Sequence, residues 1–401
     1  MGLFDKIFKK KTTDKNLAYM QFMNGYVPFF SRWTSAAYQS DVVRSVIDCI
    51  ARNGAKFKGR HIRKSGGKLQ DLNDNLNRIL QYQWNPIMNS YAALYKVISE
   101  LYDPASNNAL IYIYKDDKGN IKGLYPLNFA NAEFLESYDG EIYMRYQFNN
   151  GRRVTVPYTS IAHLRMFFKE DDMFGSSSET VLKPTLQLIK TSDEGIINAV
   201  KSSAFLRGIL KFTGVLKPTD IKNERDRFVS EYLSTENNGG IGALDSKAEF
   251  IKTDLQPKMV DAEQMKLIEE KVYKFFSVNE KIVKSQYTED EWNAFYESVL
   301  EPIALQLSLE LTNKIFTETE RGFGNEIVFE ANRLQYVSVK TKVQLIKELA
   351  PYGILRINEA REIFNLGPVE GGDKRILAVG GEAELIDDNG KVGDDDNENN
   401  Q

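Results

Sequence analysis

Apolar side chains recur at intervals of three and four residues along Pro257–Phe316, and this period predicts two helices. The first carries its apolar positions from Met265 to Phe276, and the second begins near Thr288–Glu289 and lasts nearly thirty residues. A helix of that length would span roughly 40 Å. Pro302 lies inside it and removes a backbone donor, so we expect the helix to bend there. The polar segment 278–288 between the helices is expected to be a loop.

Upstream of this stretch, the same period predicts three shorter helices: Val43–Ile50, Leu72–Leu80 and Leu94–Leu101. Ser40 stands where it can cap the first of them. From Asn108 the period changes to two, which indicates strands divided by turn sequences such as Asp139-Gly140. Six runs have this period: Leu110–Tyr114, Gly123–Pro126, Ala132–Glu136, Glu141–Phe148, Arg152–Tyr158 and Ile161–Phe167. We therefore expect an antiparallel meander with helices to one side, in which His163 is a structural strand residue.

A long helix is expected after Gly175, with Pro184 tolerated in its first turns and an end near Arg207-Gly208. A compact α/β insert then follows, with these expected elements: strands at Ile209–Phe212, Ile241–Leu244 and Glu249–Ile251, and a helix from Thr219 to Tyr232. Downstream of the two-helix stretch, three further elements are predicted: a strand at Glu326–Glu330 and helices at Lys340–Leu349 and Asn358–Phe364. Pro351-Tyr352-Gly353 is expected to separate the last two helices.

The balance of charge excludes a strong electrostatic grip on duplex DNA. The 401 residues carry a net charge of −4, and the last 20 hold eight acidic residues and one lysine. The first 15 residues hold five lysines and two aspartates, so the middle of the chain is close to neutral. Proteins that hold DNA through many phosphate contacts usually show a basic excess. Any DNA contact is therefore expected to be weak and permissive, and the acidic C-terminal end is expected to be disordered.

The N-terminal region is rich in lysine and aromatic residues. Gly2–Phe8 with the lysines that follow fits an amphipathic membrane foot or, as we favour, a basic flexible start, and Lys6 stands where an acylation signal prefers Ser or Thr. Seven aromatic residues in Tyr19–Tyr38 fit either an arm on a neighbouring subunit or a cap on the chain's own domain. No apolar run approaches the roughly eighteen residues of a membrane span, and no secretory signal is visible. We expect synthesis in a cytoplasm and no membrane partner.

Residues suited to catalysis, metal binding or cofactor binding are scarce. The chain has a single cysteine and two histidines, while its 42% of hydrophobic residues allow a sizeable core in two to four folded units. Gly54 and Gly59 have the spacing of a phosphate loop, but Arg60-His61 replaces the Lys-Ser/Thr pair that should follow. Gly175–Glu179 lacks the last glycine of a nucleophile elbow. We therefore expect no enzymatic activity, no cofactor and no metal site.

The order of these parts resembles the portal proteins of tailed double-stranded-DNA bacteriophages, in the branch typical of long-tailed phages. The segments that carry the resemblance are spread along the chain: Met1–Lys11, Val156–Arg165, Phe174–Ser177, Glu301–Ile303, Ile357–Arg361, Gly367-Pro368 and Gly371–Asp373. Together they cover most of the sequence.

The resemblance implies an α+β, portal-like fold with a named part for each segment. The parts it implies are an N-terminal arm (1–39), an α/β wing (40–175) with a return to it (318–335), two stem helices (176–207 and 257–277) carrying a small α/β clip (208–256), a channel loop (278–288), a long kinked spine helix (289–317), a short helical crown (336–373) and an acidic, disordered tail (374–401).

The resemblance also implies a function and partners. Proteins of this family form a ring, commonly of twelve subunits, at one capsid vertex of the virion, and DNA passes through it during packaging and ejection. The implied partners are the terminase large subunit, the major capsid and scaffolding proteins and a head-tail adaptor protein, with synthesis in the host bacterial cytoplasm. The alternative is another non-catalytic virion connector or a scaffold-binding oligomer.

Two sets of side chains are candidates for contacts in such a ring. The candidates for contact with DNA lie in the channel loop: Asn279, Lys281, Lys284, Ser285, Gln286 and Tyr287. The candidates for docking of the motor or adaptor lie on the helix of the clip: Lys222, Arg225 and Arg227. That helix also carries acidic residues, so a solvated face remains the alternative for the second set.

Overall fold

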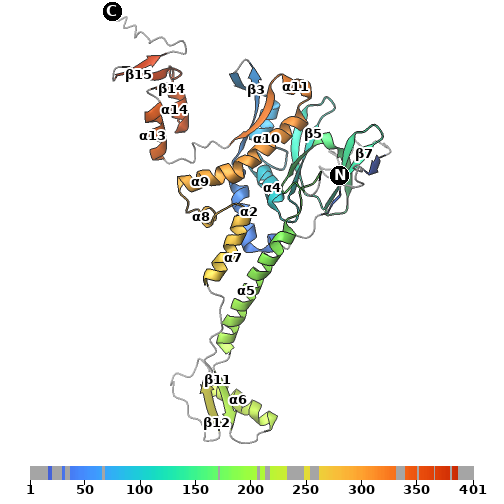
Figure 1. The fold of residues 1–401 in the computed structure, drawn as a ribbon, viewed down its shortest axis with the longest axis vertical. Coiled ribbons are helices and arrows are strands. Elements are labelled where there is room, and N and C mark those ends of the chain that lie inside the picture. The colour runs from blue at the N-terminus through green and yellow to red at the C-terminus, as the bar shows by residue number, and fades with distance from the viewer. Residues whose placement is uncertain are drawn as a thin grey trace, which may run out of the picture. The chain divides into compact units, whose positions relative to one another are not determined.

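Helices are combined with sheets in which every described strand pairing is antiparallel, which agrees with the expected α+β class (Figure 1). The computed structural model describes residues 17–19, 29–31, 37–65, 68–169, 172–205, 208–212, 217–232, 248–252, 262–330, 339–349, 352–364, 366–379 and 382–386. The chain divides into two compact units, one formed by residues 1–182 and 273–401 and the other by residues 183–272.

Three helices begin the described core of the first unit: α2 (Asp41–Gly54), α3 (Asn75–Gln81) and α4 (Ser90–Tyr102). All three were expected from their apolar period, but α3 begins at Asn75, so Leu72 precedes it. Asp74 caps α3 by accepting a hydrogen bond from the Asn77 amide at 2.8 Å. Ser40 precedes α2 as expected, yet its side chain makes no capping bond, and the Val42 amide donates to the carboxylate of Asp41.

All six expected strands are present: β5 (Asn108–Lys115), β6 (Ile121–Leu127), β7 (Asn131–Ser137), β8 (Ile142–Gln147), β9 (Arg153–Pro157) and β10 (Ile161–Arg165). The expectation of one meander is wrong, because β10 pairs with β5 and not with β9. The strands form two sheets, one of order β10-β5-β6 and one built on β7-β8-β9. Leu110 of the first and Phe134 and Tyr146 of the second share one buried cluster. Two sheets bury the apolar faces that a single open meander would leave exposed.

Two short N-terminal strands complete the second sheet. β1 (Leu17–Tyr19) and β2 (Phe29–Ser31) both pair antiparallel with β7. Phe30 is buried, and its ring centroid lies 5.5 Å from that of Phe129 and 5.6 Å from that of Phe174. For these two strands the structure supports the cap on the chain's own domain, and residues 20–28 and 32–36 of the aromatic segment lie outside the described residues.

The two-helix stretch contains more elements than expected: α7 (Ala262–Phe275), α8 (Glu280–Val283), α9 (Glu289–Phe295), the π-helical segment η3 (Tyr296–Leu300) and α10 (Glu301–Ile315). Helical structure is continuous from Glu289 to Ile315, as predicted. The irregularity lies just before Pro302, because a proline cannot donate to the carbonyl four residues earlier and its ring clashes with that carbonyl. The apolar face of α10 packs against β10 and against β13 (Asn325–Glu330).

One sheet of the first unit was missed in part. β3 (Lys58–Ser65) and β4 (Lys68–Asp71) form a hairpin, and the expected strand β13 pairs with β3 over Asn325–Glu330. The turn of α11 (Glu318–Gly322) leads into β13 through Gly324, whose φ is +82°. A Cβ atom at Gly324 would lie 2.1 Å from the carbonyl oxygen of Lys64, so the close approach of the two chains requires glycine.

The second unit contains most of α5 (Glu179–Phe205) with the strands β11 (Gly208–Phe212) and β12 (Ala248–Lys252) and the helix α6 (Pro218–Tyr232). The strands pair antiparallel. Pro184 falls within the first two turns of α5, and the helix continues beyond it as expected. The expected strand at Ile241–Leu244 lies outside the described residues.

Residues 339–386, here called the C-terminal region, contain two helices and a three-stranded sheet: α13 (Val339–Leu349), β14 (Tyr352–Arg356), α14 (Ile357–Ile363), β15 (Arg375–Val379) and β16 (Glu382–Ile386). Both helices were expected, but β14 takes the place of the expected turn at 351–353. The expectation of a disordered tail from 374 is wrong for β15 and β16, which pair with each other. Residues 387–401 lie outside the described residues.

Candidate functional site

The candidate segment 278–288 is held in place at its start and in its middle by buried side chains. Val278 and Ile282 are 6% and 2% exposed, and the Val278 amide bonds to the carbonyl of Tyr273 at 2.9 Å. The expectation of a plain loop is wrong, since the segment contains the helical turn α8. Asn279 accepts a hydrogen bond from the Ile282 amide at 2.8 Å and so caps that turn. The side chain of Asn279 therefore stabilises the helical turn α8.

Both candidate lysines form ion pairs with acidic residues, one in α8 and the other in α9. Lys281 pairs with Glu291, and Lys284 pairs with Glu280. The hydrogen bond from Lys281, helped by the backbone amide of Thr288, lowers the pKa of the Glu291 carboxyl. The lysine side chains remain more than half exposed, so the pairs are open to water. The positive charge expected on this segment is present but locally balanced.

The remaining candidates, Ser285, Gln286 and Tyr287, form the C-terminal part of the turn. Ser285 has a φ of +58°, and the Gln286 amide closes the turn by donating to the carbonyl of Lys281 at 2.8 Å. The Tyr287 ring is 42% exposed and stacks on Trp292 with their centroids 5.1 Å apart. The structure therefore brings the six candidates together in one compact turn between α7 and α9.

The sequence reasoning missed the acidic and aromatic partners of these candidates. Glu280 precedes Lys284 by four residues on a short helix, a spacing that predicts an ion pair. Thr288 and Glu291 form a reciprocal capping box at the start of α9, and the Thr-x-x-Glu pattern is its known signature. No spacing rule connects Lys281 to Glu291, because that pair depends on the path of the whole turn.

The docking candidates lie on α6 in the second unit, where their charges are shared with acidic neighbours. Arg225 pairs with Asp226, and Arg227 pairs with Glu224 at 3.8 Å. Lys222 is exposed. The helix face is mixed in charge, as the sequence indicated.

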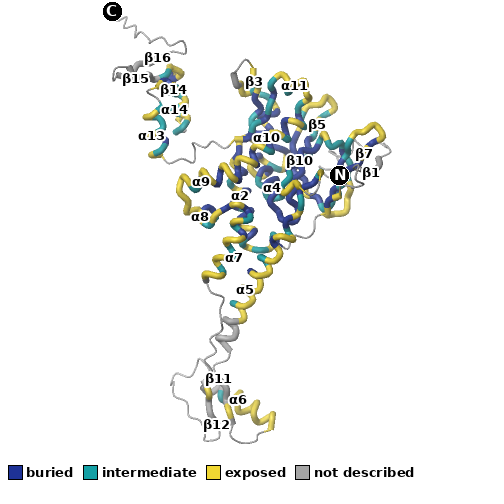
Figure 2. Tube along the Cα trace, in the orientation of Figure 1, coloured by how far each residue is buried: buried dark blue, intermediate teal, exposed yellow. Residues whose placement is uncertain are grey.

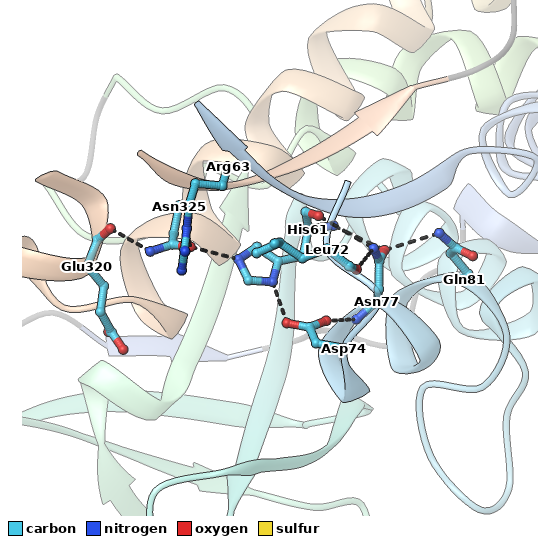
Figure 3. Close-up of polar contacts among 8 residues, drawn as sticks. All are labelled: His61, Arg63, Leu72, Asp74, Asn77, Gln81, Glu320 and Asn325. Atoms are coloured by element: carbon cyan, nitrogen blue, oxygen red, sulfur yellow. Dashed lines mark hydrogen bonds and ion pairs between the residues drawn. The ribbon is translucent and has the colours of Figure 1, made fainter. Parts of the chain in front are cut away.

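A second polar cluster joins β3, the start of α3 and β13 around the buried His61 (Figure 3). Its ring Nδ1 lies 2.6 Å from a carboxylate oxygen of Asp74, and its Nε2 lies 3.2 Å from the side-chain oxygen of Asn325. Arg63 donates to that same oxygen of Asn325, whose amide nitrogen donates to the carbonyl of Glu320 at 2.9 Å. These bonds tie three elements that are distant in sequence, and a cavity of about 780 Å³ opens beside them. The cluster therefore holds β3, α3 and β13 together, which is a structural role.

His163 is the structural strand residue that the sequence predicted. It is 1% exposed in β10, with Nε2 3.0 Å from the side-chain oxygen of Asn108 and Nδ1 3.4 Å from the hydroxyl of Tyr158. Burial lowers the pKa of His163 well below 6.5, and the charges of Arg165 and Lys314 lower it further. The ring is therefore neutral at physiological pH and serves to connect strands.

Among the residues that the structure describes, no group of three or more His, Cys, Asp or Glu side chains is arranged to hold a metal ion. None of the described helices is long and apolar enough to cross a bilayer.

Comparison with known proteins gives agreement over most of the chain. The model of the phage portal protein family matches residues 41–365. The probable portal proteins of Lactococcus phages p2 and SK1 are each 23% identical over 180 residues, which are 43% of this chain and 48% of theirs. The match thus spans about half the length of these curated relatives.

Two solved structures share the fold. A chain from the neck of a native gene transfer agent particle, computed with C12 symmetry, is 16% identical and aligns with a TM-score of 0.62 over 85% of this chain and 95% of its own. A chain from the neck of an empty particle, computed with C6 symmetry, aligns with a TM-score of 0.62 over 84% of this chain and 92% of its own.

Proposed function

This chain belongs to the phage portal protein family, and from that premise we propose that twelve copies form a ring at one vertex of a virion capsid. DNA passes through the ring during packaging and ejection, and the role of the protein is positional and not catalytic. The observation that carries the proposal is the shared fold, over 85% of the chain, with a neck protein computed with C12 symmetry.

We assign the parts of the ring by the order of elements. Residues 40–175 and 318–335 form the wing, and the pairing of β13 with β3 supports this assignment. The stem helices are 176–207 and 257–277, and they carry the clip 208–256. The crown is 336–373.

We further propose that the turn 278–288 faces the channel and that 289–317 is the spine helix behind it. The pairing of Lys281 with Glu291 and of Lys284 with Glu280 supports weak contact with DNA, because each lysine must leave a carboxylate to bind a phosphate. Fewer net phosphate contacts give lower affinity and a weaker salt dependence. The backbone of DNA can then slide without being read.

Electron micrographs of the purified full-length protein test the ring itself. We expect an annulus with an open channel wide enough for duplex DNA. Monomers alone at micromolar concentration would contradict the proposal, and a solid particle would favour another connector or a scaffold-binding oligomer.

Substitutions in the turn test its place in the channel. Lys281→Ala with Lys284→Ala should lower packaging of DNA while rings still assemble. Glu280→Gln provides the matched control, because it releases Lys284 and should raise the affinity for DNA in a manner that salt removes. Loss of rings in the lysine variant would show that the turn lies at a contact between subunits.

We propose that the basic residues of α6 dock the terminase large subunit during packaging and the head-tail adaptor protein afterwards. Their exposure on a helix of the second unit supports this role. Replacing Lys222, Arg225 and Arg227 by Glu should reduce binding of either partner by pull-down without loss of rings. Unchanged binding of both partners would leave α6 as a solvated face. The major capsid and scaffolding proteins are the further partners that a vertex position requires.

A further inference from the structure

The C-terminal region forms two helices and a three-stranded sheet, yet it buries no large apolar side chain among those whose exposure the structure describes. Among its residues of described exposure (339–349, 352–364 and 366–375), Lys342, Gly353 and Gly372 are buried, and no large apolar side chain is. Six large apolar side chains are instead exposed: Val339 69%, Val343 38%, Tyr352 75%, Ile354 58%, Leu366 52% and Val369 42%. Figure 2 shows the same contrast, with exposed and half-buried positions along α13 and α14.

The region is nevertheless well ordered by polar contacts. Asn358 accepts a hydrogen bond from the Val369 amide at 2.9 Å, and the Asn358 amide bonds to the carbonyl of Gly372 at 2.8 Å. Lys342 reaches the carbonyl of Ile363 at 3.2 Å and so joins α13 to α14. A unit of this size rarely folds on hydrogen bonds alone, since too little surface is removed from water. Exposed apolar side chains gathered in one small unit indicate a surface that a partner covers.

The charges of the region indicate which partner that is. α13 exposes Lys340, Lys347 and Glu348, a net charge of +1, whereas α14 and the segment that follows it expose Glu359, Glu362, Glu370, Asp373 and Lys374, a net charge of −3. Within the described residues, no ion pair joins the lysines to these glutamates. A nucleic acid or an anionic membrane would favour a single positive sign. Opposite charges on two faces of one chain fit a head-to-tail contact between copies, in which the two faces meet.

We propose that the C-terminal regions of adjacent copies complete each other's core, with α13 of one copy against α14 of the next. The exposed apolar side chains of α13, of β14 and of the segment after α14 become buried in this contact, and the lysines of one copy face the glutamates of its neighbour. This inference rests on the ring proposed above and names the surface that closes it. A head-to-tail contact of this kind is repeated around the ring until it closes.

The apolar half of the inference is tested with full-length protein carrying Tyr352→Ser and Ile354→Ser. Since both side chains are exposed in a single copy, the circular dichroism spectrum and the melting temperature of dissociated protein should not change. The protein concentration for half-assembly, measured by mass photometry, should rise by at least about tenfold. Tyr138→Ser is the matched control, because Tyr138 is 98% exposed at the β7–β8 turn and should leave assembly unchanged.

The electrostatic half is tested by reversal and rescue. Lys340→Glu with Lys347→Glu should weaken assembly, and the further addition of Glu362→Lys with Glu370→Lys should restore it by exchanging the two faces. Rings of unchanged stability in both the serine and the reversed variants would overturn the inference while the proposed function stands. Absence of rings from the unmodified protein would overturn both.

Discussion

The body of the first unit and its C-terminal region are built from the same kinds of element and differ in what those elements bury. In the body, residues 37–182 and 273–330 enclose side chains such as Phe134, Tyr146 and Leu311, each with no exposed surface. In the C-terminal region, helices and strands form without enclosing any large apolar side chain of described exposure. The body buries its own apolar side chains, whereas in our proposal the C-terminal region buries its exposed ones against an adjacent copy.

The largest expected effect contrasts a buried and an exposed aromatic residue. Phe134→Ala removes a ring that packs against Tyr158 and Phe174, with centroids 4.9 and 5.0 Å away. It should lower the free energy of unfolding by about 3–5 kcal/mol. Tyr352→Ala in dissociated protein should change it by less than about 0.5 kcal/mol. Urea unfolding measures both, and equal losses would show that the two regions do not differ as described.

A smaller effect is expected where two strands of the body approach closely. Gly324 and Gly151 share a φ of +82°, but only at Gly324 would an added Cβ atom meet neighbours within 4 Å, the nearest being the Lys64 carbonyl oxygen. Gly151→Ala should cost about 1–2 kcal/mol from backbone strain. Gly324→Ala adds a clash with backbone and should cost about 2–4 kcal/mol. Thermal unfolding of the two variants separates strain from crowding, and equal costs would contradict the close approach.

A third effect depends on pH and arises from the buried imidazole of the body. His163 keeps its pKa well below 6.5 in the folded chain because of burial, while in the unfolded chain it gains a proton near pH 6.5. As the pH falls below about 6.5, the unfolded state binds the extra proton, and the free energy of unfolding should fall by up to about 1.4 kcal/mol per pH unit. This loss continues until the pH reaches the pKa of the folded state.

Urea unfolding between pH 7.5 and pH 5 measures how the free energy of unfolding falls in the wild type and in His163→Gln. The fall due to His163 is at most roughly 1.4 kcal/mol per pH unit. The variant should show a shallower dependence on pH than the wild type. An identical dependence would mean that the ring is not held neutral.

The smallest effect concerns the polar contact between the two regions. The hydroxyl of Thr341 in α13 donates to the carboxylate of Glu289 in α9 at 2.9 Å. Thr341→Val keeps the shape and removes the bond, so global stability should change by less than about 0.5 kcal/mol. Hydrogen exchange in α13 of dissociated protein should nevertheless become faster. Unchanged exchange would show that this bond does not restrain α13.

Regular periodicity allowed most of the helices and strands to be predicted from the sequence. The long helix from Glu289 to Ile315 has an unbroken apolar stripe, and the strands from Asn108 onward are divided by clear turn residues. The strands β3 and β4 were missed because Lys58–Asp71 is largely basic and polar, so its alternation is weak. That hairpin is stabilised by β13, more than 250 residues away, and no local pattern reports such a partner.

Composition misled the interpretation of the C-terminal end. Glu382–Ile386 was grouped with the acidic residues that follow it, although it alternates apolar and polar residues like an ordinary strand. At the candidate site, Lys281 and Lys284 were named from the sequence, but the acidic residue that pairs with each of them was not predicted. The pair Lys284–Glu280 follows a helical spacing, whereas Lys281–Glu291 exists only because the turn folds back on the start of α9. Rules of sequence spacing predict a contact of the first kind but not one of the second.

The extra residue in the π-helical segment η3 determines how α9, which precedes it, is rotated about the helix axis. A π turn contains about one residue more than an α turn, so α9 is rotated by about 100° about its axis relative to an uninterrupted α-helix. Within α9, Trp292 is 7% exposed and stacks against the ring of Tyr287. The direction in which the turn 278–288 points is thus fixed by backbone geometry near Pro302, well outside the turn itself.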